Sequence, residues 1–260
     1  MITSAFDPEK VARYVLAEHD RRADFRNLPA EIAPKTVAEA YAAQVALVPL
    51  LAARKGAVAG LKIATTTKVM QRLMGIDHPC GGTIFAQTVH HSPAQLRLAD
   101  YQHVMIECEL ALQLARDLTT TSAPYTAQTV KPAVGAVMPA FELIEDRNAD
   151  YKQTSALSLI ADNCWNGGIV LGAPVAYDGR PLAGIAGRLS VNGSTTHDGR
   201  SDDALETLAW IANLAAGQNR PLAAGMVVIT GSVIATLPIA PGDRFVFTLD
   251  GLGTTEVTAR

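Results

Sequence analysis

Apolar residues in the first 75 positions recur at the spacing of helices. Asp7 followed by Pro8 is typical of a helix N-terminus. The apolar residues of this first predicted helix share one face: Val11, Tyr14, Val15 and Leu16. Thr36 and Glu39 fit a capping box, which predicts a second helix through the apolar stretch that follows. A third helix is expected over residues 66–75.

The later part of the chain changes to the two-residue alternation of strands. Residues 103–114 alternate well, with one apolar face and a second face that carries Glu107 and Glu109. Asn192-Gly193 is a strong hairpin signal. Further strands are expected at 139–145, 167–176, 188–191 and 226–235, with a final hairpin of 244–250 and 254–259.

Among these β segments the pattern indicates a single longer helix, capped by Ser201 and running through residues 205–214. Because helices do not alternate regularly with the strands, a doubly wound parallel sheet is not expected. No Ser- or Gly-rich linker and no internal repeat divides the chain. The sequence therefore predicts one α+β domain over residues 1–260, mainly helical in 1–80 and β-rich in 81–260.

Composition narrows the class of protein. The 260 residues are 48% hydrophobic, and the net charge is −3, which gives no electrostatic footprint for nucleic acid or an anionic membrane. No apolar run approaches the roughly 20 residues that span a bilayer, and the N-terminus lacks a signal-peptide pattern. Cys80, Cys108 and Cys164 fit neither a disulfide framework nor a thiolate zinc site. We expect a soluble, cytoplasmic protein.

Glu107 and Glu109 are the sharpest chemical feature of the sequence. Residues two apart on a strand point to the same side, so two like charges project from one face. One interpretation is a solvated strand face, and the other is a site for Mg²⁺ or Mn²⁺, which prefer oxygen ligands. Glu142 adds a third acid in an apolar strand, where a lone buried carboxylate is costly. The residues alone leave both interpretations open.

The other candidate residues also have two interpretations each. Lys62 lies between small and apolar residues. It is either a desolvated catalytic amine or a surface lysine whose aliphatic stem is buried. Asp77, in a loop rich in glycine and proline, is a turn former or a proton-transfer group. Thr230, Gly231 and Ser232 end a buried strand and either bind a carboxylate or form a bend.

Segments along almost the whole chain together resemble one family. They are TVAEAYAAQ at 36–44, GLKIATTT at 60–67, LMGIDHPCGGTIF at 73–85, IECELALQLARDL at 106–118, PAFELIEDR at 139–147, ADNCWNGGIVLG at 161–172, LAWIAN at 208–213, VVITGSVIATLPIAPGDRF at 227–245 and GLGTTEV at 251–257. In these segments the chain resembles the 2-keto-4-pentenoate hydratase and 4-oxalocrotonate decarboxylase family, within the fumarylacetoacetate hydrolase superfamily.

The resemblance implies a helical N-terminal region packed on a mixed β-roll or barrel-like core. It implies that Glu107, Glu109 and Glu142 ligate Mg²⁺ or Mn²⁺, which a 2-keto acid substrate chelates. Lys62 would act in proton transfer or steady an enolate, and Asp77 would supply the other proton-transfer group. The substrate carboxylate would be held by Thr230, Gly231 and Ser232.

The reaction implied by the resemblance is hydration of a 2-hydroxy-2,4-dienoate, of the 2-keto-4-pentenoate type, to a 4-hydroxy-2-oxo acid in aromatic meta-cleavage catabolism. Decarboxylation of the 4-oxalocrotonate type and hydrolysis of an acylpyruvate C–C bond are alternatives on the same scaffold. An alternative of another class is a non-catalytic partner subunit of a hydratase–decarboxylase complex. A homo-oligomer is expected, with a homologous decarboxylase or hydratase as a further partner.

Three segments depart from the usual pattern of the family. Ala64 replaces a glycine after the lysine, and Cys80 stands where the loop normally has a second acid. Trp165 and Asn166 occupy positions where small residues are usual. These changes put the substrate and the details of proton transfer in question, while the three glutamates are kept.

Overall fold

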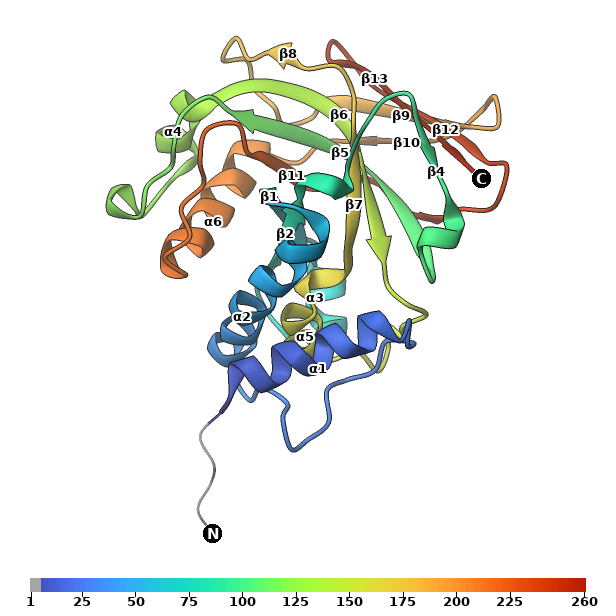
Figure 1. Cartoon of the computed structure of the whole chain (residues 1–260). Coiled ribbons are helices and arrows are strands. Elements are labelled where there is room, and N and C mark those ends of the chain that lie inside the picture. Colours follow the sequence, from blue (N-terminus) through green and yellow to red (C-terminus); the bar gives the residue numbers. More distant parts are fainter. Residues whose placement is uncertain (1–5) are drawn as a thin grey trace.

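The computed structural model describes residues 6–260, with a group of helices at one end and the strands at the other (Figure 1). The helical end contains α1 (Pro8–Asp20), α2 (Val37–Lys55) and α5 (Ala156–Ala161). α2 packs against both α1 and α5. The expectation about a signal peptide falls partly on residues 1–5, which lie outside the described residues.

The first two helices begin where the sequence predicts. The Asp7 carboxylate accepts a hydrogen bond from the backbone N–H of Lys10 at 3.0 Å. The Thr36 hydroxyl accepts one from the N–H of Glu39 at 3.1 Å. The reciprocal bond of the expected capping box is shifted by one residue, because the Glu39 carboxylate accepts from the N–H of Lys35 at 2.6 Å.

The chain then forms β1 (Val58–Ala64), α3 (Lys68–Met74) and β2 (Cys80–Phe85). α3 begins after Thr67 and ends at Gly75, as expected. β1 is a strand inside the part expected to be mainly helical, and it lies between β2 and β11 (Val227–Pro238). Gly60 permits this parallel pairing, because a Cβ there would lie 1.9 Å from the carbonyl oxygen of Val227. A short strand inside a sheet lacks the alternation that reveals half-buried strands.

The larger sheet has the strand order β2-β1-β11-β5-β6-β7-β3, with β8 paired to β6. Its other members are β3 (Val89–His91), β5 (Val104–Leu114), β6 (Val134–Glu145), β7 (Asn166–Leu171) and β8 (Val175–Ala176). β5 confirms the strand expected at 103–114, β6 begins earlier than expected, and the segment 167–176 divides into β7 and β8. The sheet curls, so that β2 contacts β7.

The smaller sheet packs against β6, β7 and β11 of the larger sheet and has the order β10-β9-β12-β13-β4. Its strands are β4 (Ala94–Leu96), β9 (Ala186–Val191), β10 (Ser194–Arg200), β12 (Arg244–Leu249) and β13 (Gly253–Ala259). Both expected hairpins are confirmed, with positive φ angles at Asn192 and Gly193. Between the sheets, the Phe141 ring lies 6.5 Å from that of Phe245 and 6.1 Å from that of Phe247.

Two further helices pack against each other: α4 (Ala127–Val130) and α6 (Ala204–Gly217). α6 also contacts β1 and β11. The prediction that Ser201 caps α6 is wrong, because Asp203 occupies the N-cap position. The Ser201 side chain faces the other way and donates a hydrogen bond to the carbonyl of Leu182 at 2.6 Å.

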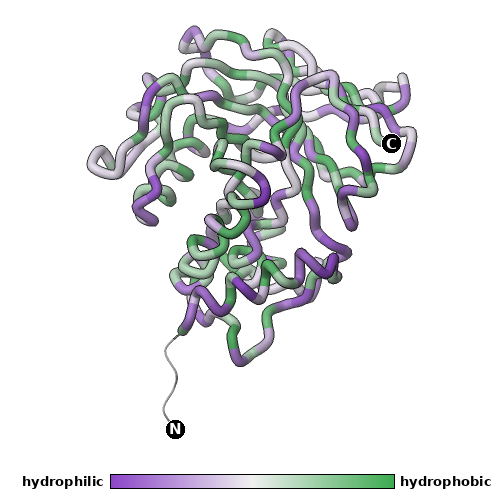
Figure 2. The backbone as a smooth tube through the Cα atoms, viewed as in Figure 1, coloured by the Kyte–Doolittle hydropathy of each residue, from purple (hydrophilic) through white to green (hydrophobic). Residues whose placement is uncertain are grey.

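α2 is long and apolar enough, by length and composition, to cross a membrane. In this fold its buried residues pack against the other elements: Ala40, Tyr41, Ala43, Gln44, Leu47, Val48 and Leu51. Figure 2 shows the same concentration of hydrophobic residues in α2 and along the inner strands. These residues form the buried face of α2.

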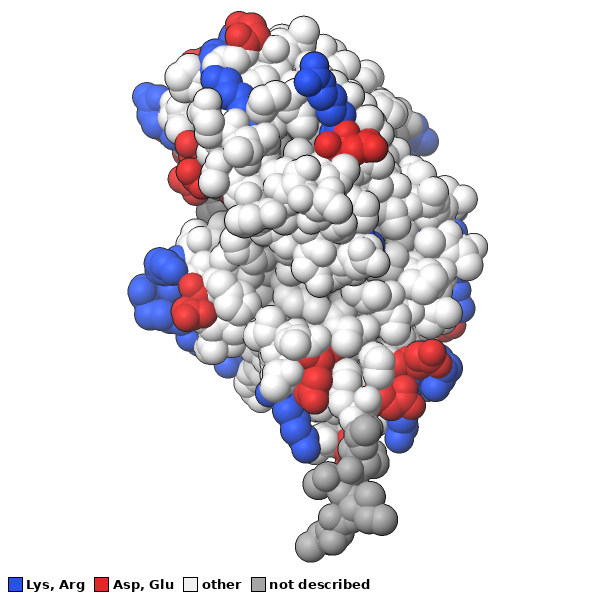
Figure 3. All heavy atoms as spheres, turned by 90° about the vertical axis from the view of Figure 1, so that its left-hand side faces the viewer, with Lys and Arg blue, Asp and Glu red and all other residues white. Residues whose placement is uncertain are grey.

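The mixed architecture agrees with the α+β class expected from the sequence. Among the described strands neither sheet closes on itself, so the barrel-like core is an open, curled sheet with a second sheet on its outside. On the face of the molecule in Figure 3, charged side chains lie mainly around the edges and the centre is nearly free of them. This face has no broad basic area of the kind that binds nucleic acid.

Candidate active site

Three glutamates converge where β5 and β6 run side by side. Glu107 and Glu109 lie two residues apart on β5, and Glu142 of β6 is opposite Glu107 in the antiparallel register. One carboxylate oxygen from each glutamate lies within 4.8 Å of the others. Because side chains alternate along a strand, the three acids share the face of Ala111 and Ala140, which the curled sheet encloses.

The glutamates differ in burial and in hydrogen bonding. Glu109 and Glu142 are fully buried, whereas Glu107 is half-buried. The backbone N–H of Gly231 donates to Glu109 Oε2 at 2.7 Å, and the hydroxyl of Thr236 donates to Glu107. Glu109 Oε1 and Glu142 Oε2 receive no hydrogen bond from the described residues. A solvated strand face is therefore excluded for this cluster.

The cluster is electrostatically costly without a cation. Burial raises the pKa of Glu109 well above its usual value, and the charges of Glu142 and Glu107 raise it further. Burial also raises the pKa of Glu142, to about 7, against the opposing effect of Lys62. A divalent cation would neutralise this charge and use the free oxygens. A donor set of carboxylate oxygens alone fits Mg²⁺ or Mn²⁺.

Lys62 adds a positive charge beside the three carboxylates. Its side chain is only 2% exposed, forms an ion pair with Glu142 and donates from Nζ to the carbonyl of Cys164 at 3.0 Å. Burial alone would lower the pKa of Lys62, but the negative charges of Glu142 and Glu107 raise it above its usual value. Lys62 is therefore a charged, buried amine and not a surface lysine.

An unusual backbone segment positions the carbonyl that holds Lys62. Asn163, Cys164 and Trp165 have φ angles of 55°, 51° and 54°, in the left-handed region that side chains other than glycine rarely adopt. The side chain of Asn163 locks this segment to β2, because it accepts from the N–H of Thr83 at 2.7 Å and donates to its carbonyl at 2.9 Å. Such conformations cost about 1–3 kcal/mol each and concentrate at functional sites.

A cavity of about 450 Å³ opens beside Lys62 and Glu107. Its wall away from these charges is mainly apolar and comes from α3, β6, α5 and the segment of Trp165: Met70, Met74, Ile144, Leu159 and Trp165. The Trp165 ring packs between Phe25 and Tyr151, with 5.1 Å between ring centroids in each case. Trp165 Nε1 has no hydrogen-bond partner among the described residues. The cavity thus has a charged end and an apolar wall.

The Thr230-Gly231-Ser232 segment interrupts the pairing of β11 with β5. Gly231 has φ of 102°, which turns its N–H toward Glu109. Gly231 and Ser232 line the cavity, whereas the Thr230 hydroxyl donates to the carbonyl of Leu110 at 2.9 Å. The segment is therefore a bend that also brings two polar groups to the cavity.

Asp77 lies apart from the other predicted site residues. It is exposed after α3 and does not line the cavity, and its backbone carbonyl accepts a hydrogen bond from Lys68 Nζ at 3.2 Å. Sequence reasoning did not identify Thr236 or Tyr151, which do line the cavity. No local pattern marks either residue, because their position depends on the bend in β11 and on the loop after β6.

The departures from the family pattern have different places in the fold. Ala64 and Trp165 line the cavity, as does Cys164. Cys80 is a buried, free thiol that is not among the residues lining the cavity, and Asn166 is buried with no hydrogen bond to its side-chain amide from the described residues. The departures that bear most directly on substrate shape are therefore Ala64 and Trp165.

Comparison with known proteins agrees with this geometry. Residues 74–260 match the family described as fumarylacetoacetate (FAA) hydrolase C-terminal. The chain is 30% identical to a 2-keto-4-pentenoate hydratase of Paraburkholderia xenovorans (strain LB400) over 201 residues, 75% of this chain and 74% of the relative. It is also 30% identical to a 2-hydroxyhexa-2,4-dienoate hydratase of Comamonas testosteroni over 232 residues, 85% and 86% of the two chains.

A similar fold is known from a 4-oxalocrotonate decarboxylase of Pseudomonas putida G7, solved in complex with magnesium and adipate. The TM-score is 0.88 at 22% sequence identity, over 97% of each chain. The fold, the matched residues and the two hydratase relatives agree with one another. The chain therefore belongs to the 2-keto-4-pentenoate hydratase family, within the fumarylacetoacetate hydrolase superfamily.

Proposed function

We propose that the protein is a divalent-metal-dependent hydratase. It adds water to a 2-hydroxy-2,4-dienoate of the 2-keto-4-pentenoate type and yields a 4-hydroxy-2-oxo acid, in meta-cleavage catabolism of aromatic compounds. The observation that carries the proposal is the convergence of three glutamates and Lys62 beside one cavity. The hydratase names of its relatives support it.

We assign the metal to Glu107, Glu109 and Glu142, as Mg²⁺ or Mn²⁺. The unsatisfied carboxylate oxygens and raised pKa values of Glu109 and Glu142 are the features that such an ion would relieve. When bound, the ion would act as a Lewis acid toward a 2-oxo acid. The magnesium complex of the solved decarboxylase supports this assignment.

Lys62 is the proposed catalytic cation. Held by Glu142 and the carbonyl of Cys164, its ammonium would donate a hydrogen bond to the oxygen at C2 of the substrate, or move a proton at that oxygen. Gly231 and Ser232 would orient the substrate carboxylate from the bend in β11, which the Thr230 hydroxyl supports.

Asp77 is the proposed second proton-transfer group, on the strength of the family resemblance. Its carboxylate lies outside the cavity, so the role requires the segment after α3 to move toward the substrate. α3 contributes Met70 and Met74 to the cavity wall. Of the residues that form this wall, those of α3 lie nearest to Asp77 in the sequence.

The cavity favours hydration over the two alternative reactions. Among the described residues that line it, only Lys62 and Glu107 are charged, and none is a histidine. Because Lys62 is already paired with Glu142, the second carboxylate of a 4-oxalocrotonate-type substrate would be buried without a cation of its own, which is costly. A His-Glu pair that activates water for C–C hydrolysis is likewise missing from the lining. A monocarboxylic dienoate with an apolar tail fits better.

We further propose a cytoplasmic homo-oligomer that acts beside a homologous decarboxylase or hydratase. Val69 and Leu73 support self-association, because they are large apolar residues on α3 that are 65% and 42% exposed. Light scattering on the purified chain tests this part independently of catalysis. A monomer at micromolar concentration would contradict the proposed homo-oligomer but would leave the proposed reaction untouched.

The reaction is tested with a panel of 2-hydroxydienoates and Mg²⁺, followed by ultraviolet absorbance and product mass. Gain of water supports the hydratase, and loss of CO₂ from a dicarboxylic member would assign the decarboxylase instead. Glu107→Ala is the matched inactive control. If no member of the panel is turned over with Mg²⁺ or Mn²⁺, the hydratase proposal is wrong. The alternative of a non-catalytic partner subunit would then replace it.

A further inference from the structure

Two of the three cysteines, from distant parts of the chain, meet beside the catalytic cavity. Cys80 begins β2 and Cys164 lies in the left-handed segment at residues 163–165, and both thiols are buried and free. The two thiols are hydrogen-bonded to each other. The thiol of Cys164 also donates to the carbonyl oxygen of Gly81, the residue after Cys80, at 3.3 Å. The cysteines therefore form a dithiol pair at one point of the fold.

The register of β1 against β2 places Cys80 on the side of the sheet that faces the cavity. Cys80 is opposite Ala64, and Gly82 is opposite Lys62. Residues opposite each other in an antiparallel pair point to the same side, as do residues two apart on one strand. Ala64 and Lys62 line the catalytic cavity, so Cys80 points to that side. Gly82 leaves room there for the backbone of Asn163, because a Cβ would lie 2.7 Å from its carbonyl oxygen.

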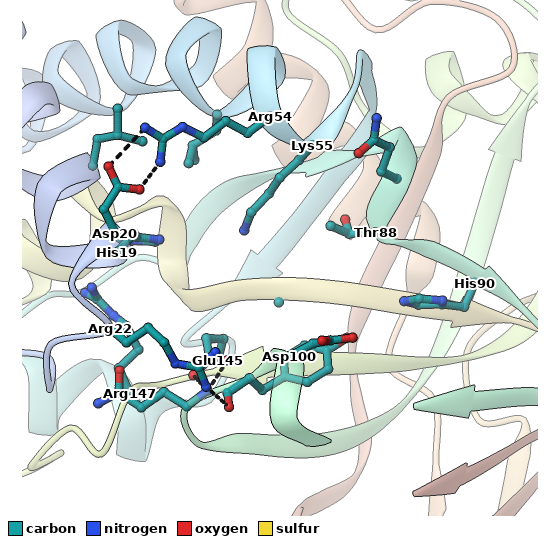
Figure 4. A pocket seen from close by; sticks show the side chains of 16 residues that line it. His19, Asp20, Arg22, Arg54, Lys55, Thr88, His90, Asp100, Glu145 and Arg147 are labelled. Carbon is teal, nitrogen blue, oxygen red and sulfur yellow. Dashed lines mark hydrogen bonds and ion pairs between the residues drawn. The ribbon is translucent and has the colours of Figure 1, made fainter. Parts of the chain in front are cut away.

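The catalytic cavity gives a small molecule access to this pair. Cys164 lines the cavity, and so does Thr65, which forms a hydrogen bond with the Cys80 thiol. A second cavity, of about 400 Å³, lies near the C-terminal ends of α1 and α2, and Figure 4 shows its mainly charged and polar side chains. Among the described residues that line this second cavity none is a cysteine. Of the two cavities, only the catalytic one leads to a thiol.

The surroundings of Cys80 favour its thiolate. The hydrogen bond with Cys164 lowers the pKa of Cys80 below its usual value, against the opposing effect of burial. The hydroxyl of Thr65 and the charge of Lys62 lower this pKa further. By contrast, burial raises the pKa of the Cys108 thiol on β5. Since the thiolate is the reactive form of cysteine, the pair is more reactive than Cys108.

We propose that Cys80 and Cys164 are a redox modification site, which a hydroperoxide converts to a disulfide. A thiolate of the pair attacks one oxygen of the hydroperoxide, so an S–O bond forms, the O–O bond breaks and an alcohol or water leaves with a proton. The other thiol then attacks this sulfenic sulfur, the S–S bond forms and water leaves. The two sulfurs together give up two electrons, which reduce the peroxide.

The disulfide would act on the catalytic cavity through Lys62, and this part rests on the proposed function. The carbonyl of Cys164 accepts a hydrogen bond from Lys62 Nζ at 3.0 Å. An S–S bond is shorter than a hydrogen bond between thiols, so its formation would pull Cys164 toward β2 and displace this carbonyl. Small misplacements of a catalytic group are costly, and we expect turnover to fall by about tenfold or more.

The test is oxidation of the reduced, full-length protein with hydrogen peroxide, followed by alkylation under denaturing conditions and peptide mass mapping without reductant. We expect a cross-linked peptide that joins Cys80 and Cys164, lighter by two hydrogens than the two free peptides. Cys108 is the internal control, because it is also buried and free and should still be alkylated. Dithiothreitol should restore alkylation of all three cysteines.

Matched variants separate the pair from other effects of peroxide. Cys80→Ser and Cys164→Ser should each abolish the cross-link, and Cys108→Ser should keep it. In the wild type the loss of dienoate turnover should be reversed by dithiothreitol, and in Cys80→Ser peroxide should cause no such reversible loss. The cross-link in the wild type is measured by mass alone, so it depends neither on the folding of the variants nor on catalysis.

The outcomes distinguish this proposal from the proposed function. Three alkylated cysteines after treatment of the wild type, or oxidised cysteines without the Cys80–Cys164 cross-link, overturn the redox site. A cross-link that leaves turnover unchanged overturns its effect through Lys62. Absence of turnover before oxidation contradicts the proposed function alone.

Discussion

The ammonium of Lys62 and the carboxylate of Glu142 form an ion pair whose side chains are only 2% and 1% exposed. Breaking such a buried pair typically costs about 3–5 kcal/mol, because one charge is left without compensation. Glu142 is also one of the three glutamates of the proposed metal site. Lys62 and a divalent cation would therefore both balance the charge of the same carboxylate.

Replacing Lys62 by methionine separates catalysis from metal binding. We expect Lys62→Met to lower turnover by about 100-fold or more, the usual effect of losing a proton-transfer group. We also expect Mg²⁺ to bind more tightly, because a competing positive charge is removed from Glu142. The dienoate assay and a calorimetric Mg²⁺ titration measure the two effects.

Lys10→Met is the matched control, since Lys10 is exposed at the start of α1, away from the catalytic cavity. It should leave both quantities near their wild-type values. A Lys62→Met protein that binds Mg²⁺ more weakly than wild type would contradict the competition between Lys62 and the metal.

The raised pKa values of Glu109 and Glu142 predict how metal binding depends on pH. In the metal-free fold these groups keep protons that the unfolded chain has lost, so they stabilise the fold most below their usual pKa, 4.5. That contribution is lost as the pH rises through the folded value, about 7 for Glu142. Mg²⁺ needs deprotonated carboxylates, so its binding should release protons and tighten as the pH rises.

Thermal unfolding with and without Mg²⁺ measures this linkage. The increase in Tm should be larger at about pH 8 than at about pH 6. Glu142→Gln, which cannot titrate, should show a smaller dependence on pH and weaker stabilisation by Mg²⁺. An equal increase in Tm at both pH values in the wild type would show that these carboxylates are not the metal ligands.

Asp77→Asn tests the proton-transfer role that rests on the family resemblance. If the segment after α3 carries the carboxylate to the substrate, kcat should fall by about 100-fold with Mg²⁺ binding unchanged. Asn supports the same loop conformations, so the fold should keep its Tm. A loss of less than about twofold would show that Asp77 serves as a turn former, as its exposed position in this structure allows.

The glutamate cluster shows which features of the site can be predicted from the sequence. The spacing of Glu107 and Glu109 predicts that both face the same side, and the structure confirms this. Their meeting with Glu142 depends on the register of β5 against β6, which no local pattern reveals. The hydroxyl of Thr236 reaches Glu107 only because β11 bends at Gly231.

Three other features could not be predicted from local sequence patterns, for similar physical reasons. β1 lies between β2 and β11, and its residues do not alternate regularly between buried and exposed positions, so the pattern that marks a half-buried strand is missing. Ser201 and Asp203 are both good N-cap residues, and tertiary contacts place Asp203 at that position. The left-handed segment at residues 163–165 depends on the contacts of Asn163 with β2, far away in the sequence.

We expect the ring of Trp165 to limit the length of the apolar tail that a substrate can carry. Its ring is buried and forms part of the apolar wall of the catalytic cavity. Trp165→Ala should therefore enlarge the cavity and raise kcat/KM for dienoates with longer apolar tails, relative to 2-hydroxypentadienoate, by about tenfold or more, because each methylene in such a pocket is worth about 1–3 kcal/mol. Competing substrates of graded tail length, separated by mass, measure the ratio.

The stability of this variant must be followed as well, because removing a buried tryptophan typically costs about 3–5 kcal/mol. Trp165→Phe keeps most of the wall and gives up only the indole N–H, which has no hydrogen-bond partner among the described residues. It should therefore keep the wild-type preference. Trp210→Ala is the second control, since Trp210 lies on α6 outside the catalytic cavity. An unchanged order of substrates in Trp165→Ala would show that the tail does not contact this wall.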